Sequence, residues 1–185
     1  ILIDSGQLVN IKNMVEDGLL TTIKTNQYYY EINSSDRFTA LCRLLDAVIG
    51  KKSLVFCRTK RDVDYLTEKL ELLNYKVSNY HGDLSPNNRE KNLKKLADGT
   101  IDTLLITDIP SNIDGVDEID LVLFSMIPHD PDSYIQRIQR LETLFPVKEV
   151  ATLIGKNEFK KLAFIKRITK SEIERKSFIE IDDII

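Results

Sequence analysis

Residues that mark specialised classes of protein are scarce in this chain. Its 185 residues include two Cys, five Pro, seven Gly and no Trp. This composition excludes a disulfide-rich scaffold, a collagen-like repeat and a low-complexity chain. Apolar runs are short as well: 121–124 is among the longest, whereas a transmembrane helix needs about 20 apolar residues. We therefore expect one compact domain without a membrane span.

The cysteines and the start of the chain bear on where the protein resides. Cys42 and Cys57 lie in separate expected elements, at a spacing that fits neither a disulfide framework nor a metal site. A reducing cytoplasm and a monomer are the simplest expectations. The chain begins ILIDSG, without an initiator Met or an apolar signal core, which we interpret as an internal piece of a longer protein.

The net charge of −3 is unevenly distributed. Residues 156–176 carry eight Lys or Arg against three Glu, whereas 101–142 carry nine Asp or Glu against two Arg. A basic segment of this kind suits a phosphate backbone, and it equally suits a solvated helix face. The charge balance alone does not decide between nucleic-acid binding and a structural role.

Familiar catalytic motifs are absent from the sequence. The glycines are too scattered for G-x-G-x-x-G or G-x-x-x-x-G-K-[ST], and there is no G-x-S-x-G. His81 and His129 have no Cys nearby, so we expect no zinc or other metal site and place both at turns or on the surface. If the chain binds a nucleotide, another domain must hold the phosphates.

Apolar periodicity predicts an alternation of strands and helices. Continuous Val-, Ile- and Leu-rich runs predict buried strands at 53–57, 77–80, 103–107, 119–124 and 149–154. Apolar residues at three- and four-residue steps predict helices at 38–48, 61–74, 86–98, 132–142 and 157–168. This order indicates an α/β fold, a doubly wound and mostly parallel sheet with helices on both faces.

Polar residues follow three of the expected strands. They are Arg58, Thr59 and Lys60, then His81, Gly82 and Asp83, then Thr107 and Asp108. Ligands of such sheets lie outside the carboxyl ends of the strands, so this edge suits gripping a phosphate backbone. Ordinary interpretations stay open: Thr59 as a helix cap, Gly82 as a turn glycine and Asp108 as a loop cap.

Four segments of the chain carry a family pattern. They read TTIKTNQYYYEINSSDRFTALCRLLD (21–46), SLVFCRTKRDVDYLTEKL (53–70), NYHGDLSPNNREKNLKKLADGTIDTLLITD (79–108) and IDLVLFSMIPHDPDSYIQRIQR (119–140). In this order they resemble the carboxy-terminal RecA-like domain of DEAD-box ATP-dependent RNA helicases. The similarity runs from about residue 8 to residue 177, so the resemblance implies a RecA-like fold.

The resemblance also implies a set of RNA contacts. In that family the segments matching VFCRTK and HGDLS touch RNA, and the TD stretch bridges RNA and nucleotide. The implied RNA-binding residues here are Arg58, Thr59, Gly82, Asp83, Arg89 and Thr107. Arg89 would support the helix that follows HGDLS, and RNA would be held through its backbone with little sequence preference.

A further motif implies contacts with ATP. The family's helix Y-I-H-R-I-G-R-x-x-R offers arginine fingers to ATP held by the other domain. Arg140 matches the first finger and Arg137 the arginine before it, with a spacing that puts both on one helix face. Asp108 and Asp114 are the other implied nucleotide contacts. For Arg137, an ion pair inside the domain, with Asp108, is the open alternative.

The sequence departs from the family pattern on the nucleotide side. The motif histidine is Gln136, the motif glycine is Gln139, and the second finger falls on Thr143. Where relatives read A-T-D-V-A-A-R-G-L-D, this chain reads ITDIPSNIDG, which replaces the motif arginine by Asn112. These losses of charge favour weakened ATP turnover.

The resemblance leads to two functional hypotheses. In the first, the chain is the C-terminal half of an ATP-dependent RNA helicase whose N-terminal RecA-like domain holds most of ATP and Mg²⁺, so that the fragment alone is inactive. In the second, it is a catalytically degenerate module that binds RNA or protein. We expect a lead-in at 1–26, the RecA-like domain at 27–170 and a C-terminal extension at 171–185.

Overall fold

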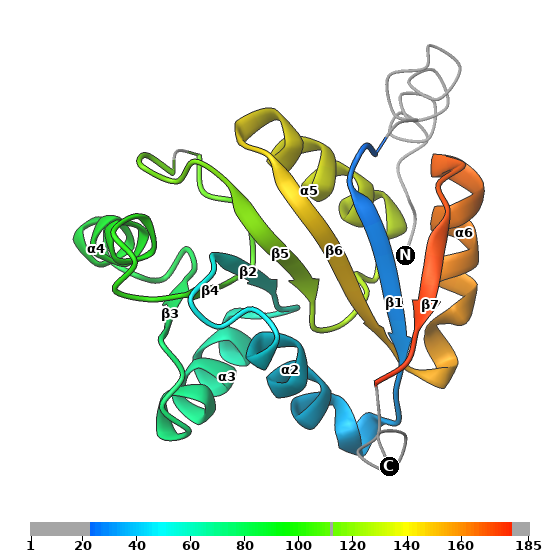
Figure 1. The fold of residues 1–185 in the computed structure, drawn as a ribbon, viewed down its shortest axis with the longest axis horizontal. Coiled ribbons are helices and arrows are strands. Elements are labelled where there is room, and N and C mark those ends of the chain that lie inside the picture. Colours follow the sequence, from blue (N-terminus) through cyan, green and yellow to red (C-terminus); the bar gives the residue numbers. More distant parts are fainter. Residues whose placement is uncertain (1–22, 112, 179–185) are drawn as a thin grey trace.

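A single sheet of parallel strands organises the protein (Figure 1). The computed structural model describes residues 23–111 and 113–178. The strands are β1 (Asn26–Glu31), β2 (Ser53–Phe56), β3 (Val77–Tyr80), β4 (Thr103–Ile106), β5 (Ile119–Phe124), β6 (Val147–Ile154) and β7 (Ile173–Lys176). They lie in the order β3-β4-β2-β5-β6-β1-β7, and all these pairs are parallel. The expected α/β fold with a parallel sheet is confirmed.

Helices cover both faces of the sheet. They are α2 (Arg37–Asp46), α3 (Lys60–Leu72), α4 (Pro86–Ala97), α5 (Pro131–Leu144) and α6 (Phe159–Thr169), with 3-10 turns at Ser34–Asp36 and Lys156–Glu158. One apolar core packs α2 and α3 against the sheet, and the other packs α4, α5 and α6 against the opposite face. Alternate residues of a strand point into opposite cores. Along β2, Leu54 and Phe56 belong to the core under α4, α5 and α6, whereas Val55 and Cys57 belong to the core under α2 and α3.

The crossovers reverse direction next to β2. After β2 the chain passes through α3 to β3 at one side of the sheet, whereas after β5 it passes through α5 to β6 at the other side. In open α/β sheets such a reversal leaves a crevice at the carboxyl ends of the strands, where ligands bind. Arg58 and Ser125, which follow β2 and β5, lie at this crevice.

Local signals fix where the helices near this edge begin. Thr59 caps α3 in a capping box: its hydroxyl accepts a hydrogen bond from the backbone N–H of Asp62, whose carboxylate accepts one from the Thr59 N–H. Ser85 caps α4 without a reciprocal bond: its hydroxyl oxygen accepts a hydrogen bond from the backbone N–H of Asn88, and α4 opens on Pro86. The expected structural role of Thr59 is therefore confirmed.

The ends of the chain depart from the sequence expectations. The strand β7 pairs with β1 inside the segment that we expected to be a C-terminal extension, so the sheet continues past residue 170. Residues 1–22 of the lead-in and 179–185 of the extension lie outside the described residues, and the domain limits stay a prediction. Within the described residues, no helix has the length and apolar character needed to cross a membrane.

Candidate functional site

A cleft of about 530 Å³ opens at the carboxyl ends of β2 and β4, beside the first turns of α5. Its lining residues are Arg58, Thr107, Asp108, Ile109, Ser133, Gln136, Arg137 and Arg140. Five of these were predicted as site residues from the sequence, some as RNA contacts and some as nucleotide contacts. The structure brings both groups together in one polar hollow.

The Arg137 side chain packs against an aromatic ring inside the domain. Its side chain is half-buried, and the guanidinium carbon lies 5.0 Å from the centre of the Phe56 ring. Burial lowers the pKa of Arg137, and the charge of Asp108 partly offsets this. Arg137 forms no ion pair with a described residue, so the alternative of an internal ion pair with Asp108 is not observed. Its main partner inside the domain is the Phe56 ring.

The Phe56 ring belongs to a chain of buried aromatic contacts. Phe56 stacks on Phe124 with ring centres 4.8 Å apart, and Phe124 lies 4.6 Å from Tyr134 of α5. The Tyr134 hydroxyl donates a 2.9 Å hydrogen bond to the Gln27 side chain of β1. Burial raises the pKa of Tyr134, so its hydroxyl stays protonated and remains a donor. These contacts join the cleft wall to β1.

Arg140 points away from this interior. Its side chain is exposed at the cleft, and no acidic residue of the described chain forms an ion pair with it. The Thr143 hydroxyl donates a 2.7 Å hydrogen bond to the Arg140 carbonyl oxygen, one turn earlier in α5. Arg140 is therefore a cation available to an anionic ligand, whereas the Thr143 hydroxyl is used in a hydrogen bond within the last turn of α5.

Thr107 and Asp108 form the wall of the cleft after β4. Thr107 is half-buried and Asp108 is exposed. One carboxylate oxygen of Asp108 accepts a 2.8 Å hydrogen bond from the backbone N–H of Ile109. The expected loop-capping role of Asp108 is thus confirmed, and the residue also lines the cleft.

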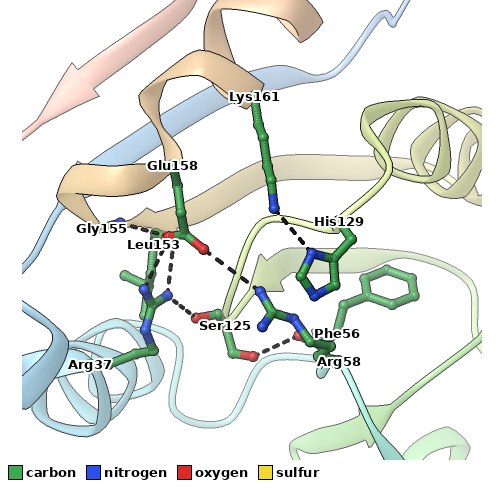
Figure 2. Close-up of polar contacts among 9 residues, drawn as sticks. All are labelled: Arg37, Phe56, Arg58, Ser125, His129, Leu153, Gly155, Glu158 and Lys161. Carbon is green, nitrogen blue, oxygen red and sulfur yellow. Dashed lines mark hydrogen bonds and ion pairs between the residues drawn. The ribbon is translucent and has the colours of Figure 1, made fainter. Parts of the chain in front are cut away.

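Arg58 stands at the cleft beside a carboxylate that the sequence analysis missed (Figure 2). Its guanidinium lies 3.9 Å from a carboxylate oxygen of Glu158, with the Arg58 side chain 34% exposed. The other Glu158 oxygen accepts hydrogen bonds from Arg37, at 3.1 Å, and from the Gly155 backbone N–H, at 2.7 Å. At 3.9 Å the pair leaves the Arg58 donors open to a stronger acceptor such as a phosphate.

Arg37 is the other missed residue of this group. It donates hydrogen bonds to the carbonyl oxygens of Ser125 and Leu153, at 2.6 and 3.2 Å, besides its bond to Glu158. These contacts join the start of α2 to the ends of β5 and β6 (Figure 2). One signal in the sequence could have predicted part of this group. Glu158 follows Gly155 at the spacing of a capping box, and its carboxylate accepts the Gly155 N–H.

The remaining predicted residues lie outside the cleft. Asp83 forms an exposed 2.5 Å ion pair with Lys60. Gly82 is exposed, and a Cβ added there would meet nothing closer than 3.9 Å, so its conformation does not require glycine. Arg89 and Asp114 line a second hollow of about 550 Å³ beside α4. Asp114 is thus not brought to the residues with which it was predicted to bind nucleotide.

The two histidines differ in position. His81 is only 5% exposed, and its Nε2 lies 2.9 Å from the Asp64 carboxylate. Its carbonyl oxygen accepts a hydrogen bond from the Leu84 backbone N–H, so His81 lies at a turn, the first of the two expected positions, and not at the surface. His129 is exposed, as expected, with Lys161 3.4 Å from its Nδ1. In the part of the chain that the structure describes, no cluster of His, Cys, Asp or Glu suited to a metal is found.

Known proteins match this chain in both sequence and fold. Residues 36–142 match the family described as "Helicase conserved C-terminal domain". The chain is 36% identical over 154 residues to a probable ATP-dependent RNA helicase of Methanocaldococcus jannaschii, covering 82% of this chain and 41% of that protein. It is 34% identical over 166 residues to the DEAD-box ATP-dependent RNA helicase CshA of Geobacillus kaustophilus, covering 90% and 36%.

Solved structures agree with these matches. The crystal structure of a DEAD box protein from the hyperthermophile Methanococcus jannaschii has a TM-score of 0.71 at 35% identity, over 82% of this chain and 42% of that chain. The structure of S. cerevisiae Dbp5 bound to RNA and ADP BeF3 has a TM-score of 0.73 at 24% identity, over 89% and 44%, which shows the shared fold. The chain thus spans less than half the length of these relatives.

Proposed function

We propose a function for this chain from one established premise: it belongs to the DEAD-box RNA helicase family, as the conserved C-terminal helicase domain. The whole protein is proposed to be an ATP-dependent RNA helicase. This chain would contribute RNA backbone contacts and an arginine finger, while the N-terminal RecA-like domain holds ATP. The observation that carries the proposal is the shared cleft of Arg58, Thr107 and Arg140.

The RNA side of the proposal rests on the donors at this sheet edge. The Arg58 guanidinium and the Thr107 hydroxyl line the cleft, and both groups suit phosphate oxygens. Gly82, on the same edge after β3, is exposed and has no side chain to keep a sugar-phosphate backbone away. Thr59 and Asp83 are held by helix capping and by Lys60, so we propose only a flanking role for them.

The nucleotide side of the proposal rests on Arg140. An exposed arginine suits the terminal phosphates of ATP, because it neutralises the charge that develops on the transferred phosphoryl group. Arg137, packed on Phe56, would position α5 and add positive potential to the cleft. Among the described residues that line the cleft, Asp108 is the one carboxylate, which does not suit holding Mg²⁺ from this side. We therefore assign Mg²⁺ to the N-terminal domain.

A second candidate function keeps the RNA contacts without catalysis. It is favoured by Thr143, which occupies the position where the family has a second arginine finger. The Thr143 hydroxyl donates a hydrogen bond to the Arg140 carbonyl oxygen instead of facing a ligand. A chain with a single finger either hydrolyses ATP slowly or serves as a binding module. The ATPase measurement on Arg140 variants described in the Discussion separates these two functions.

The isolated chain is expected to show neither ATP turnover nor duplex unwinding. Its sequence contains no G-x-x-x-x-G-K-[ST] loop to cradle phosphates. The measurement is phosphate release by the purified chain with and without RNA, against a heat-inactivated sample. Turnover above that control, lost on Arg140→Ala, would reveal an active site within this chain.

Replacing Arg58 by alanine is expected to weaken single-stranded RNA binding about fivefold to tenfold for all sequences alike, because one charge-assisted phosphate contact is lost. The slope of log affinity against log salt should fall by about 1. Fluorescence anisotropy with labelled oligo-uridine and oligo-adenosine measures both quantities. The matched control is Lys51→Ala, which removes one positive charge from an exposed residue ahead of β2, at the opposite edge. Equal losses in both variants would contradict a specific role for Arg58.

A further inference from the structure

A third, more apolar pocket shares Arg58 with the cleft. It has a volume of about 340 Å³ and lies between the start of α2, one face of α3 and the segment after β5. Its apolar walls are Phe38, Leu41, Tyr65, Leu66 and Met126. Its polar members are Ser34, Ser35, Arg37, Arg58, Asp62 and Ser125. Arg58 lines both this pocket and the cleft, so the two hollows share one guanidinium.

An exposed aromatic ring borders the pocket. Tyr65 is 53% exposed, although the helix that carries it also contributes to the core through Val63 and Leu70. The Lys69 ammonium lies 4.7 Å from the centre of the Tyr65 ring and 5.2 Å from that of Phe38, and it thereby bridges the two rings. The free part of the Tyr65 ring is available to a planar ligand.

The charges around the pocket favour a ligand with a phosphate. Among residues 23–111 and 113–178, the acidic partner of Arg58 is the distant Glu158 oxygen, at 3.9 Å, and Lys69 adds a second positive charge. The carboxylate of Asp62 is occupied, because it accepts hydrogen bonds from the backbone N–H and the hydroxyl of Thr59. A flat, largely apolar group carrying an attached anion therefore suits this pocket.

We propose that the pocket takes one unpaired RNA base, with Tyr65 as its stacking surface, while Arg58 holds the phosphate attached to it. This inference rests on the proposed RNA contact of Arg58. An aromatic side chain next to a phosphate-binding arginine is the usual combination for single-stranded nucleic acid. A base within a duplex is stacked between its neighbours and cannot enter, so the pocket selects unpaired RNA.

Tyr65 variants test the pocket directly. Tyr65→Ala is expected to weaken single-stranded RNA binding about tenfold, in the range of a lost base–aromatic stack, whereas Tyr65→Phe keeps the ring and the affinity. The control is Leu72→Ala on the same helix, where the side chain is 76% exposed and lies outside the pocket. Thermal unfolding of each variant verifies the fold. Unchanged binding by Tyr65→Ala overturns the proposal and leaves a protein segment as the candidate occupant.

Abasic RNA separates the pocket from the phosphate contacts. An oligonucleotide with the same sugar-phosphate backbone but no bases should bind the wild-type chain about tenfold more weakly than oligo-uridine, and Tyr65→Ala should not weaken it further. If abasic RNA binds as well as oligo-uridine and Arg58→Ala weakens both, the base pocket is wrong and the phosphate interface stands. If Arg58→Ala weakens neither, the proposed RNA function fails as well.

Discussion

Replacing Arg140 by alanine in the full-length helicase is expected to lower ATP turnover about 10³- to 10⁵-fold, the range found for arginine fingers in phosphoryl transfer. The reason is that Arg140 is an exposed cation at the cleft, whereas Arg137 is committed to the Phe56 ring. Because the Arg140 guanidinium forms no ion pair with a described residue, its removal should leave the stability of this domain nearly unchanged. The measurement is steady-state ATP hydrolysis at saturating RNA.

Two further variants make this result specific. Gln136→Ala alters a neighbouring exposed side chain of the same cleft without changing charge, and it should retain turnover. Arg137→Ala should lower turnover and stability together, because it removes the cation packed on Phe56. Turnover by Arg140→Ala equal to that of an active wild type would rule out the finger. A wild type without turnover would favour the binding module.

Replacing Arg37 by alanine is expected to lower the free energy of unfolding by about 2–4 kcal/mol, a large share of the roughly 5–15 kcal/mol that stabilises a typical domain. The substitution leaves the carbonyl oxygens of Ser125 and Leu153 without this donor. It also leaves Glu158, whose side chain is 14% exposed, without its closest cation. Urea unfolding followed by circular dichroism measures the loss.

A matched ion pair elsewhere on the sheet provides the control. Arg175 lies 2.7 Å from Glu31, but its side chain is 58% exposed, so Arg175→Ala should cost less than about 1 kcal/mol. Arg37→Lys should recover only part of the stability, since one ammonium cannot reproduce the planar guanidinium that reaches all three acceptors. Equal losses for Arg37→Ala and Arg175→Ala would show that burial of the Arg37 group adds nothing.

Strands with continuous apolar runs were predictable from the sequence, whereas β1 and β7, which have no such run, were not. β2 and β4 are buried along their whole length, which is the pattern that SLVF and TLLI indicate. In β7 only Ile173 is buried, and the other residues are charged. Its place in the sheet comes from pairing with β1, a contact between opposite ends of the chain. Local pattern carries no information about such a pairing.

The candidate site divides in the same way. The gathering of Arg58 and Thr107 followed from strand order, because the carboxyl ends of parallel strands share one edge, whereas Arg140 of α5 was expected from the resemblance alone. The Arg37–Glu158 pair was not foreseen, since the two residues are 121 positions apart and each is unremarkable in its own segment. Asp114 was carried over by resemblance, and the structure puts it in a different hollow. His81 lies at a turn, as one of its two expected positions, but its burial depends on neighbouring elements and could not be predicted from the local sequence.

The aromatic chain from the cleft to β1 has a mechanical consequence. Arg137, Phe56, Phe124 and Tyr134 are in contact one after another, and Tyr134 ends on the buried Gln27. Helix α5 therefore cannot roll about its own axis without unstacking rings and breaking that buried hydrogen bond. If Arg140 reaches a nucleotide as proposed, we therefore expect the domain to move as one rigid body and α5 not to rotate on its own.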